Sequence, residues 1–248
     1  MLFIETEKSS LPTILLLHGG GLSWWSLKPV VELLREKYHV ITPVIDGHGE
    51  DASKTFISIE NSAQQLIRYI DTYHGGKLYA IGGLSIGAQI VTEVLSIRES
   101  IADYAILESA LVYPIKGTAF LTVPAYKLFY GLIKYRWFAR LQAKTLCVPD
   151  DMFEQYYKDS LNMTQQSLIH MTLSNGTYAL KNTISNTKAK VLILVGGKEI
   201  PIMKKSAQKL HKAMNSSDLH ILPNMGHGEV SLLHPEMYVE LISNFFSK

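Results

Sequence analysis

The sequence predicts an α/β fold in which a mostly parallel sheet is packed between two layers of helices. Short apolar runs alternate with amphipathic stretches along the chain, and this alternation is typical of strands that are connected by helices. Several runs, such as Ile14 to Leu17 and Val191 to Val195, are apolar without interruption, as expected for strands covered on both faces. A chain of 248 residues, 47% of them apolar, can bury a large core in one domain with an inserted subdomain.

The alternation is regular from the N-terminus to residue 109. A short strand is expected at 2–6, and the run "TILLLHG" at 13–19 is the first strongly predicted strand. The stretch "LKPVVELLREKY" at 27–38 has the apolar spacing of an amphipathic helix. The same two patterns then recur: we expect further strands at 39–45, 77–83 and 103–109, and further helices at 58–73 and 85–97.

The alternation stops after about residue 110 and resumes near residue 186. In this last part we expect strands at 190–197 and 218–223 and helices at 204–214 and 234–248. Pro235 lies near the first turn of the final helix, a position that suits proline. We therefore divide the chain into a core of residues 1–110 and 186–248 and an insertion of residues 111–185.

The composition argues against nucleic-acid partners and membrane-spanning segments. The formal charge is only +2, and no stretch approaches the roughly 18 apolar residues of a membrane span. Glu5 and Glu7 lie where a signal peptide would need an apolar core, and the single cysteine, Cys147, suits a reducing compartment. We expect a cytoplasmic protein that acts on a small molecule without stable membrane insertion, and the sequence leaves its oligomeric state open.

Ser85 lies at the point where a predicted strand gives way to a predicted helix, in "GLSIG" at 83–87. Small neighbours at Gly83 and Gly87 allow strand and helix to approach closely around a sharp turn, with the hydroxyl at the carboxyl edge of the sheet. The free N–H groups of the helix N-terminus favour developing negative charge there. A glycine-rich turn that serves packing alone is the alternative interpretation.

Three other motifs follow predicted strands, so we expect them at the same sheet edge. They are "HGGG" at 18–21, "GGKE" at 196–199 and "GHG" at 226–228. The glycines of the first leave backbone N–H groups unobstructed beside the serine. The last places His227, a candidate general base, in the loop after the final strand.

The ordered combination of these four motifs resembles the α/β-hydrolase superfamily, in particular its serine esterases and lipases. The resemblance covers essentially the whole chain outside the insertion. It implies that Ser85 is the nucleophile and that His227 is the general base. It also implies an oxyanion hole formed by the backbone N–H groups of Gly20 and Ile86, with Gly21 as an alternative to Gly20.

The acid of the implied triad departs from the usual pattern. The family commonly has an aspartate where this sequence has Glu199, although a carboxylate one methylene longer can hold the histidine if the loop adjusts. Glu108 ends the strand expected at 103–109 and is a rival, because some members take the carboxylate from that strand. A solvated loop charge is the alternative interpretation of Glu199.

The resemblance implies acyl transfer to water, with Ser85 attacking an ester carbonyl and water releasing the acid. We expect a carboxylesterase that cleaves a small or medium ester and needs neither a metal nor an organic cofactor. Trp24, just after the glycines, is expected to line the acyl pocket. The alternatives are hydrolysis of a lactone, thioester, amide or carbon–carbon bond, and a catalytically slow, receptor-like binding protein.

The insertion coincides with the place where the family carries a helical cap, so the resemblance implies that residues 111–185 shape the pocket. From 111 to 149 the sequence has six basic residues and no acidic one, interleaved with aromatic residues. The favoured interpretation is that the aromatic side chains pack inward beneath solvated lysines and arginines. Attraction of an anionic substrate and contact with a membrane surface are the alternatives.

Overall fold

A computed structural model describes residues 1–7 and 10–247, and within them seven strands form one sheet. Its strand order is β1-β3-β2-β4-β5-β6-β7, and all neighbours are parallel except β1 and β3. The strands are β1 (Leu2–Glu5), β2 (Thr13–Leu17), β3 (His39–Val44), β4 (Leu78–Leu84), β5 (Ala102–Glu108), β6 (Lys190–Gly196) and β7 (Ser217–Leu222). The predicted mostly parallel sheet is confirmed, and each strand begins within one residue of its expected position.

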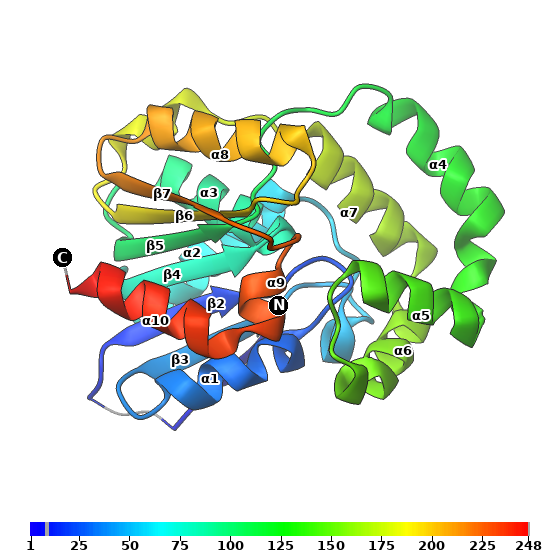
Figure 1. The fold of residues 1–248 in the computed structure, drawn as a ribbon, viewed down its shortest axis with the longest axis horizontal. Helices are drawn as coiled ribbons and strands as arrows, with labels where there is room; N and C mark the ends of the chain where they lie inside the picture. Colours follow the sequence, from blue (N-terminus) through cyan, green and yellow to red (C-terminus); the bar gives the residue numbers. More distant parts are fainter. Residues whose placement is uncertain (8–9, 248) are drawn as a thin grey trace.

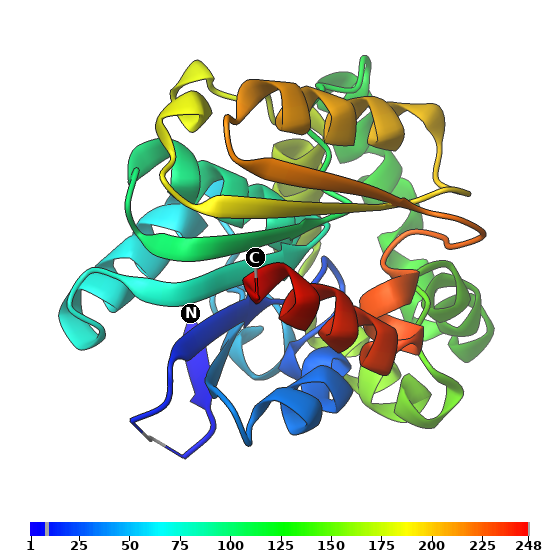
Figure 2. The same ribbon diagram turned by 60° about the vertical axis from the view of Figure 1, so that its left-hand side comes forward.

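Helices cover both faces of this sheet and make three layers (Figure 1). The helices α2, α3 and α8 pack on one face, and α1 and α10 pack on the other (Figure 2). Their bounds are α1 (Lys28–Leu34), α2 (Ile59–Tyr73), α3 (Ile86–Ile97), α8 (Pro201–Ala213) and α10 (Pro235–Phe246). A short helix that the sequence did not predict, α9 (Glu229–Leu233), precedes α10. Lys248, the last residue of the expected final helix, lies outside the described residues.

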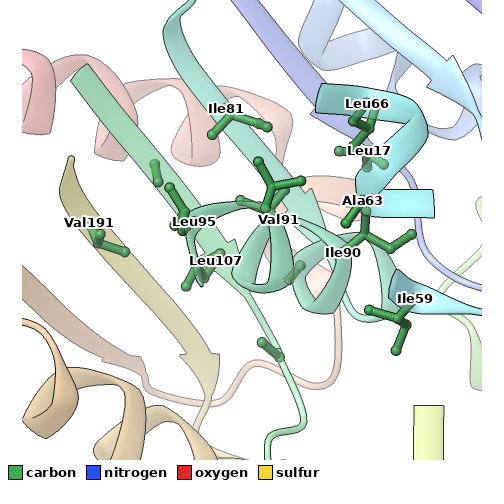
Figure 3. Packing of buried hydrophobic residues seen from close by; sticks show 14 of the residues in the cluster. Leu17, Ile59, Ala63, Leu66, Ile81, Ile90, Val91, Leu95, Leu107 and Val191 are labelled. Atoms are coloured by element: carbon green, nitrogen blue, oxygen red, sulfur yellow. The ribbon is translucent and has the colours of Figure 1, made fainter. Parts of the chain in front are cut away.

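The central strands are buried on both sides, which explains their unbroken apolar sequences. In β2, Leu15 and Leu17 contribute to the core under α2 and α3, whereas Ile14 and Leu16 contribute to the core under α1 and α10. Successive side chains of a strand point to opposite faces, so both sets must be apolar. Figure 3 shows side chains of α3, among them Val91, packed between the strands and α2.

The segment between β5 and β6 folds into helices that lie beyond the carboxyl ends of the strands (Figure 1). These helices are α4 (Thr118–Phe129), α5 (Arg136–Thr145), α6 (Phe153–Asn162) and α7 (Gln165–Thr177). The helix α7 is attached to the core, because Ser174 Oγ accepts the N–H of Ile59 at 2.9 Å and Ser167 Oγ accepts that of Phe56 at 3.2 Å. In the described part of the chain, none of the helices combines the length and the apolarity needed to cross a membrane.

The aromatic side chains of this segment are not all packed inward. Tyr126, Tyr130 and Phe138 are partly buried, whereas Phe120, Phe129, Tyr135 and Trp137 are exposed. The helices α4 and α5 turn one side to α7 and α6 and the other side to solvent. The favoured interpretation of inward packing is therefore wrong for the four exposed side chains, because nothing in the described residues covers the outer sides of α4 and α5.

Candidate active site

Ser85 occupies a sharp turn between β4 and α3, at the carboxyl edge of the sheet. Its φ of 55° and ψ of −115° lie in a region that a residue other than glycine adopts only when its surroundings hold it there. The N–H of Ser85 donates to the carbonyl oxygen of Glu108 at 2.8 Å, and its carbonyl accepts the N–H of Gln89 at 3.0 Å. Both sides of the turn are thus fixed by backbone hydrogen bonds.

The glycines on either side of Ser85 are required by close backbone contacts. A Cβ at Gly83 would lie 2.4 Å from the carbonyl carbon of Gly87, so the strand and the helix can approach only if Gly83 has no side chain. A Cβ at Gly87 would lie 2.6 Å from the carbonyl oxygen of His18. The "GLSIG" motif is therefore explained by the geometry of the turn and by the loop that follows β2.

That neighbouring loop, at 18–21, is anchored by a buried histidine. His18 Nδ1 donates to the carbonyl oxygen of Gly19 at 2.8 Å, and its Nε2 accepts the N–H of Ile45 at 3.1 Å. Burial, followed by the nearby His48 ring, lowers the pKa of His18 to about 3, so the ring stays neutral and can accept this bond. The anchored loop places Gly20 beside a cavity that Ser85 and Ile86 also line.

Glu199 and His227 form a hydrogen-bonded pair at the same sheet edge. His227 Nδ1 lies 2.7 Å from Glu199 Oε2. The other carboxylate oxygen of Glu199 accepts the hydroxyl of Ser109 and the N–H of Gly196, each at 2.7 Å. Three donors therefore surround this buried carboxylate, and its remaining freedom to rotate is small. A neutral His227 that donates from Nδ1 has its Nε2 left as an acceptor.

The loops that carry the pair are joined to each other by main-chain contacts. The N–H of Lys198 donates to the carbonyl oxygen of Met225 at 2.9 Å. A Cβ at Gly196 would lie 2.4 Å from that same oxygen, so the two loops can meet only if residue 196 is glycine. On the His227 side, Glu229 Oε2 accepts the N–H of Gly226 at 2.6 Å. The loops that carry Glu199 and His227 are thus packed directly against each other.

Glu108 lies at the same edge but in a different environment. It is fully buried, and the N–H of Ser231 donates to its Oε1 at 3.4 Å. Its Oε2 has no hydrogen-bond partner among the described residues. Burial raises the pKa of Glu108 to about 7, and the nearby charge of Glu199 adds to the increase. The carboxylate that contacts His227 is therefore that of Glu199, and Glu108 stands beside the pair.

Ser109 was not singled out from the sequence, although it is part of this arrangement. It follows β5 directly, has a φ of 55° and donates its hydroxyl to Glu199. The signal that drew attention to Glu108, the carboxyl end of a buried strand, also applies to the next residue along the chain. A rule that covers the first residue after each strand would have included Ser109.

Two cavities are lined by Ser85, and a third adjoins them. The smallest is lined by Ser85, His227 and Gly20 together with apolar side chains, so the serine and the histidine face one space. A second contains Ser85, Ile86 and Met171, and the third, of about 370 Å³, extends among the inserted helices. Gly20 borders all three cavities. The spaces beside the serine therefore adjoin a mostly apolar cavity under the inserted helices.

Trp24 is placed away from these spaces. Its indole N–H donates to Glu50 at 2.9 Å, and the residues that line the three cavities do not include it. The expected role of Trp24 in an acyl pocket therefore has no support in the geometry. The apolar lining that the sequence did not single out comes from the inserted helices and their connections, with Ile133, Leu146 and Leu168 among its members.

The arrangement assembles a hydroxyl, an imidazole and a carboxylate, with the serine at a helix N-terminus. Such a set can deprotonate the hydroxyl, hold the resulting imidazolium and stabilise an oxyanion with backbone N–H groups. Among residues 1–7 and 10–247, no group of three or more His, Cys, Asp and Glu side chains is placed to hold a metal ion.

Comparison with known proteins identifies the family. The model of the family described as "Alpha/beta hydrolase family" matches residues 14–241, which include all four motifs and the inserted helices. No curated protein matches the sequence significantly.

Solved structures share the fold at low sequence identity. A thermophilic esterase from Thermogutta terrifontis is 18% identical with a TM-score of 0.78, over 99% of this chain and 92% of that one. An esterase from Exiguobacterium antarcticum is 16% identical with a TM-score of 0.81, over 99% and 96% of the two chains. An enol-lactonase from Burkholderia xenovorans LB400 is 13% identical with a TM-score of 0.80, over 100% and 96%. At these identities the likeness concerns the fold.

Proposed function

The chain belongs to the alpha/beta hydrolase family, and on that premise we propose that it is a serine carboxylesterase. One observation carries the proposal: His227, whose Nδ1 is hydrogen-bonded to Glu199, lines the same small cavity as Ser85. Acyl transfer to water needs a serine that can give its proton to a histidine, and a carboxylate that holds the histidine.

In the proposed mechanism His227 takes the proton of Ser85 through Nε2, and the Ser85 oxygen attacks the ester carbonyl carbon. Glu199 accepts the Nδ1–H of His227, so it fixes the ring and stabilises the imidazolium. The N–H groups of Gly20 and Ile86 stabilise the oxyanion as it forms. The alcohol leaves with the proton from His227, and a water molecule then releases the acid by the reverse sequence.

The cavity under the inserted helices supports an ester with an apolar acyl chain. Its volume of about 370 Å³ falls in the range of small-molecule pockets, and its lining is mostly apolar. Its lining is drawn largely from the segment between β5 and β6, so we propose that residues 111–185 act as a cap that selects the chain length. The solved structures of two esterases with the same fold add support.

The test is hydrolysis of p-nitrophenyl esters of increasing acyl length by the wild type and by Ser85→Ala. The proposal expects turnover that peaks at one chain length and falls by roughly four orders of magnitude or more in the variant. Full activity in Ser85→Ala would mean that another group is the nucleophile. A wild type that binds these esters without turnover would favour a receptor-like member, and turnover of lactones alone would make the enzyme a lactonase.

A further inference from the structure

The outer sides of α4 and α5 expose large apolar side chains at the end of the molecule that lies farthest from the amino ends of the strands (Figure 1). Phe120 is 80% exposed, Leu128 is 74% exposed and Trp137 is 64% exposed. We call this surface the α4–α5 face and define its apolar part as Phe120, Leu121, Leu128, Phe129, Trp137 and Leu141. An exposed apolar group of this size on a folded protein marks a contact surface.

The spacing along α4 gathers these side chains on one side of the helix. Phe120, Pro124 and Leu128 recur every four residues, so they lie above one another, and all three are exposed. The opposite side of α4 is used for packing, because the Tyr126 hydroxyl lies 2.9 Å from Thr172 Oγ1 on α7. The apolar side of α4 is therefore the one that faces solvent.

The stretch that carries the apolar part is basic, and exposed acidic residues begin only after it, at Asp150, Asp151 and Glu154. Residues 111–149 contain no Asp or Glu, and every basic side chain in this stretch is exposed: Lys116, Lys127, Lys134, Arg136, Arg140 and Lys144. In the described part of the chain, Arg136 is the member of this set that forms an ion pair, with Glu154. Arg140 lies over the Phe153 ring, 4.1 Å from its centroid, so both arginines are engaged on the side of α6. The four lysines form no ion pair within the described residues, and exposed lysines beside exposed aromatic and aliphatic side chains are the pattern of a helix surface that lies in a membrane interface.

Other occupants fit this surface less well. A second copy packed on the same face about a two-fold axis would bring the two basic sets together, which like-charge repulsion opposes. A single-stranded nucleic acid would use the basic and aromatic side chains, but Leu121, Leu128 and Leu141 cannot stack on bases. An anionic lipid surface uses all of them, because it accepts apolar side chains below its headgroups and attracts lysine and arginine at their level.

We propose that the α4–α5 face binds the protein peripherally to membranes that contain anionic phospholipids. Phe120, Leu128 and Trp137 enter the interface, and the surrounding lysines and arginines contact the headgroups. No helix crosses the bilayer in this mode of binding, and the core of the protein stays outside it.

The surface also borders the cavity that adjoins the spaces beside Ser85. Leu141 belongs to the α4–α5 face and to the lining of the 370 Å³ cavity, and Tyr126 on α4 lines the same cavity. A protein bound through this face holds the cavity near the lipid. Delivery of an apolar ester from the membrane to Ser85 rests on the proposed function, whereas the binding itself does not.

The test is co-sedimentation of the purified full chain with vesicles of equal parts phosphatidylcholine and phosphatidylglycerol, and with vesicles of phosphatidylcholine alone. We expect stronger binding to the anionic vesicles, weakened by salt. The double variant Phe120→Ser, Leu128→Ser should lower the partition coefficient roughly tenfold or more, and Lys127→Glu, Lys134→Glu should lower it chiefly for the anionic vesicles.

Matched controls lie on parts of the chain away from the inserted helices. Tyr73→Ser removes an exposed aromatic at the end of α2, and Lys205→Glu, Lys212→Glu reverses two exposed charges on α8. Both controls should bind vesicles as the wild type does. Thermal unfolding and hydrolysis of a soluble p-nitrophenyl butyrate should be unchanged in every variant, which separates lost binding from lost folding.

A wild type that ignores anionic vesicles overturns the proposal, and so does equal binding by the wild type and both double variants of the face. Capture of a single-stranded oligonucleotide without vesicle binding, or a dimer that Leu128→Ser dissociates without vesicle binding, overturns it as well. Vesicle binding without ester turnover leaves this proposal standing and removes the proposed function. Ester turnover without vesicle binding overturns this proposal and leaves the proposed function standing.

Discussion

The carboxyl edge of the sheet and the inserted helices α4 to α7 differ in how their residues are held. At the sheet edge, main-chain contacts leave no room for a Cβ at Gly83, Gly87 or Gly196. In the insertion, Gly131, between α4 and α5, has no atom within 4 Å of the place where its Cβ would lie, and Phe120 and Trp137 face solvent. Where the insertion is tight, the contact is with a side chain: a Cβ at Gly176 in α7 would lie 2.6 Å from that of Thr118. The edge is held by contacts between main chains, whereas the insertion is held by contacts of side chains and leaves part of its surface open.

This difference separates chemistry from recognition. The candidate catalytic side chains depend on turns that are fixed by hydrogen bonds such as that from Ser85 N–H to the Glu108 carbonyl. The cavity and the exposed apolar surface depend on the side chains of the inserted helices and their connections. Changes at the edge should therefore abolish activity or folding, while changes in the insertion should alter what is bound.

The largest expected effect compares two carboxylates at the sheet edge. Glu199→Gln should lower kcat by roughly 10³- to 10⁴-fold, because an amide no longer stabilises the imidazolium of His227. Glu108→Gln should lower kcat by less than about tenfold, because Glu108 contacts Ser231 rather than the histidine. Steady-state hydrolysis of a p-nitrophenyl ester by both variants decides the assignment, and the reverse pattern would make Glu108 the acid.

The second comparison uses one glycine from each region. Gly87→Ala should lower the free energy of unfolding by about 3 kcal/mol, because its Cβ would meet two backbone carbonyl oxygens. Gly131→Ala should change it by less than about 1 kcal/mol, since its Cβ would enter open space. Urea unfolding, monitored by circular dichroism, measures the free energy of unfolding of both variants. Equal destabilisation would show that the two regions are held alike.

The third prediction concerns the pH dependence of stability. Between the ordinary carboxyl pKa of 4.5 and the value of about 7 for Glu108, the folded protein keeps a proton that the unfolded chain has released. The free energy of unfolding should therefore fall as pH rises through this window, by up to about 3 kcal/mol. Glu108→Gln should remove this decrease in the free energy of unfolding, so the variant should be more stable than the wild type above pH 7.

Urea unfolding at a series of pH values checks this prediction. The control is Glu36→Gln, which changes an exposed carboxyl after α1 and should keep the pH dependence of the wild type. A Glu108→Gln variant with the same dependence as the wild type would show that this buried carboxyl does not control stability.

The smallest expected effect concerns chain-length selection by the inserted helices. Leu168→Trp fills part of the cavity and should lower kcat/KM for long acyl esters roughly tenfold, with little change for short ones. Leu161→Trp changes an exposed leucine on α6 and should leave the preference as it is. If both variants lower kcat/KM equally for esters of every length, the acyl chain does not lie in this cavity.

The fold followed from the sequence because its signals are local. Runs such as Ile14 to Leu17 are apolar because both sides of the strand are covered, and that requirement is visible without knowing the neighbours. The exposure of Phe120 and Trp137 had no such signal. Helical spacing shows which side chains share a face, but whether another element covers that face depends on tertiary packing.

The candidate site was predictable to a similar extent. The motif order placed Ser85, Glu199 and His227 at one edge, because parallel strands end together. It did not decide between Glu199 and Glu108, since both lie at the carboxyl ends of neighbouring strands and the choice depends on loop hydrogen bonds. Trp24 was chosen for its nearness to the glycines in sequence, but its indole turns toward Glu50.

The most direct test of the account is labelling with a p-nitrophenyl phosphonate, followed by intact mass measurement and peptide mapping. An activated serine attacks the phosphorus and keeps the phosphonyl group, so the mass increase identifies the nucleophile. The account predicts one adduct per chain, located on Ser85, and much slower labelling of His227→Ala. An adduct on another residue, or labelling that does not depend on His227, would contradict it.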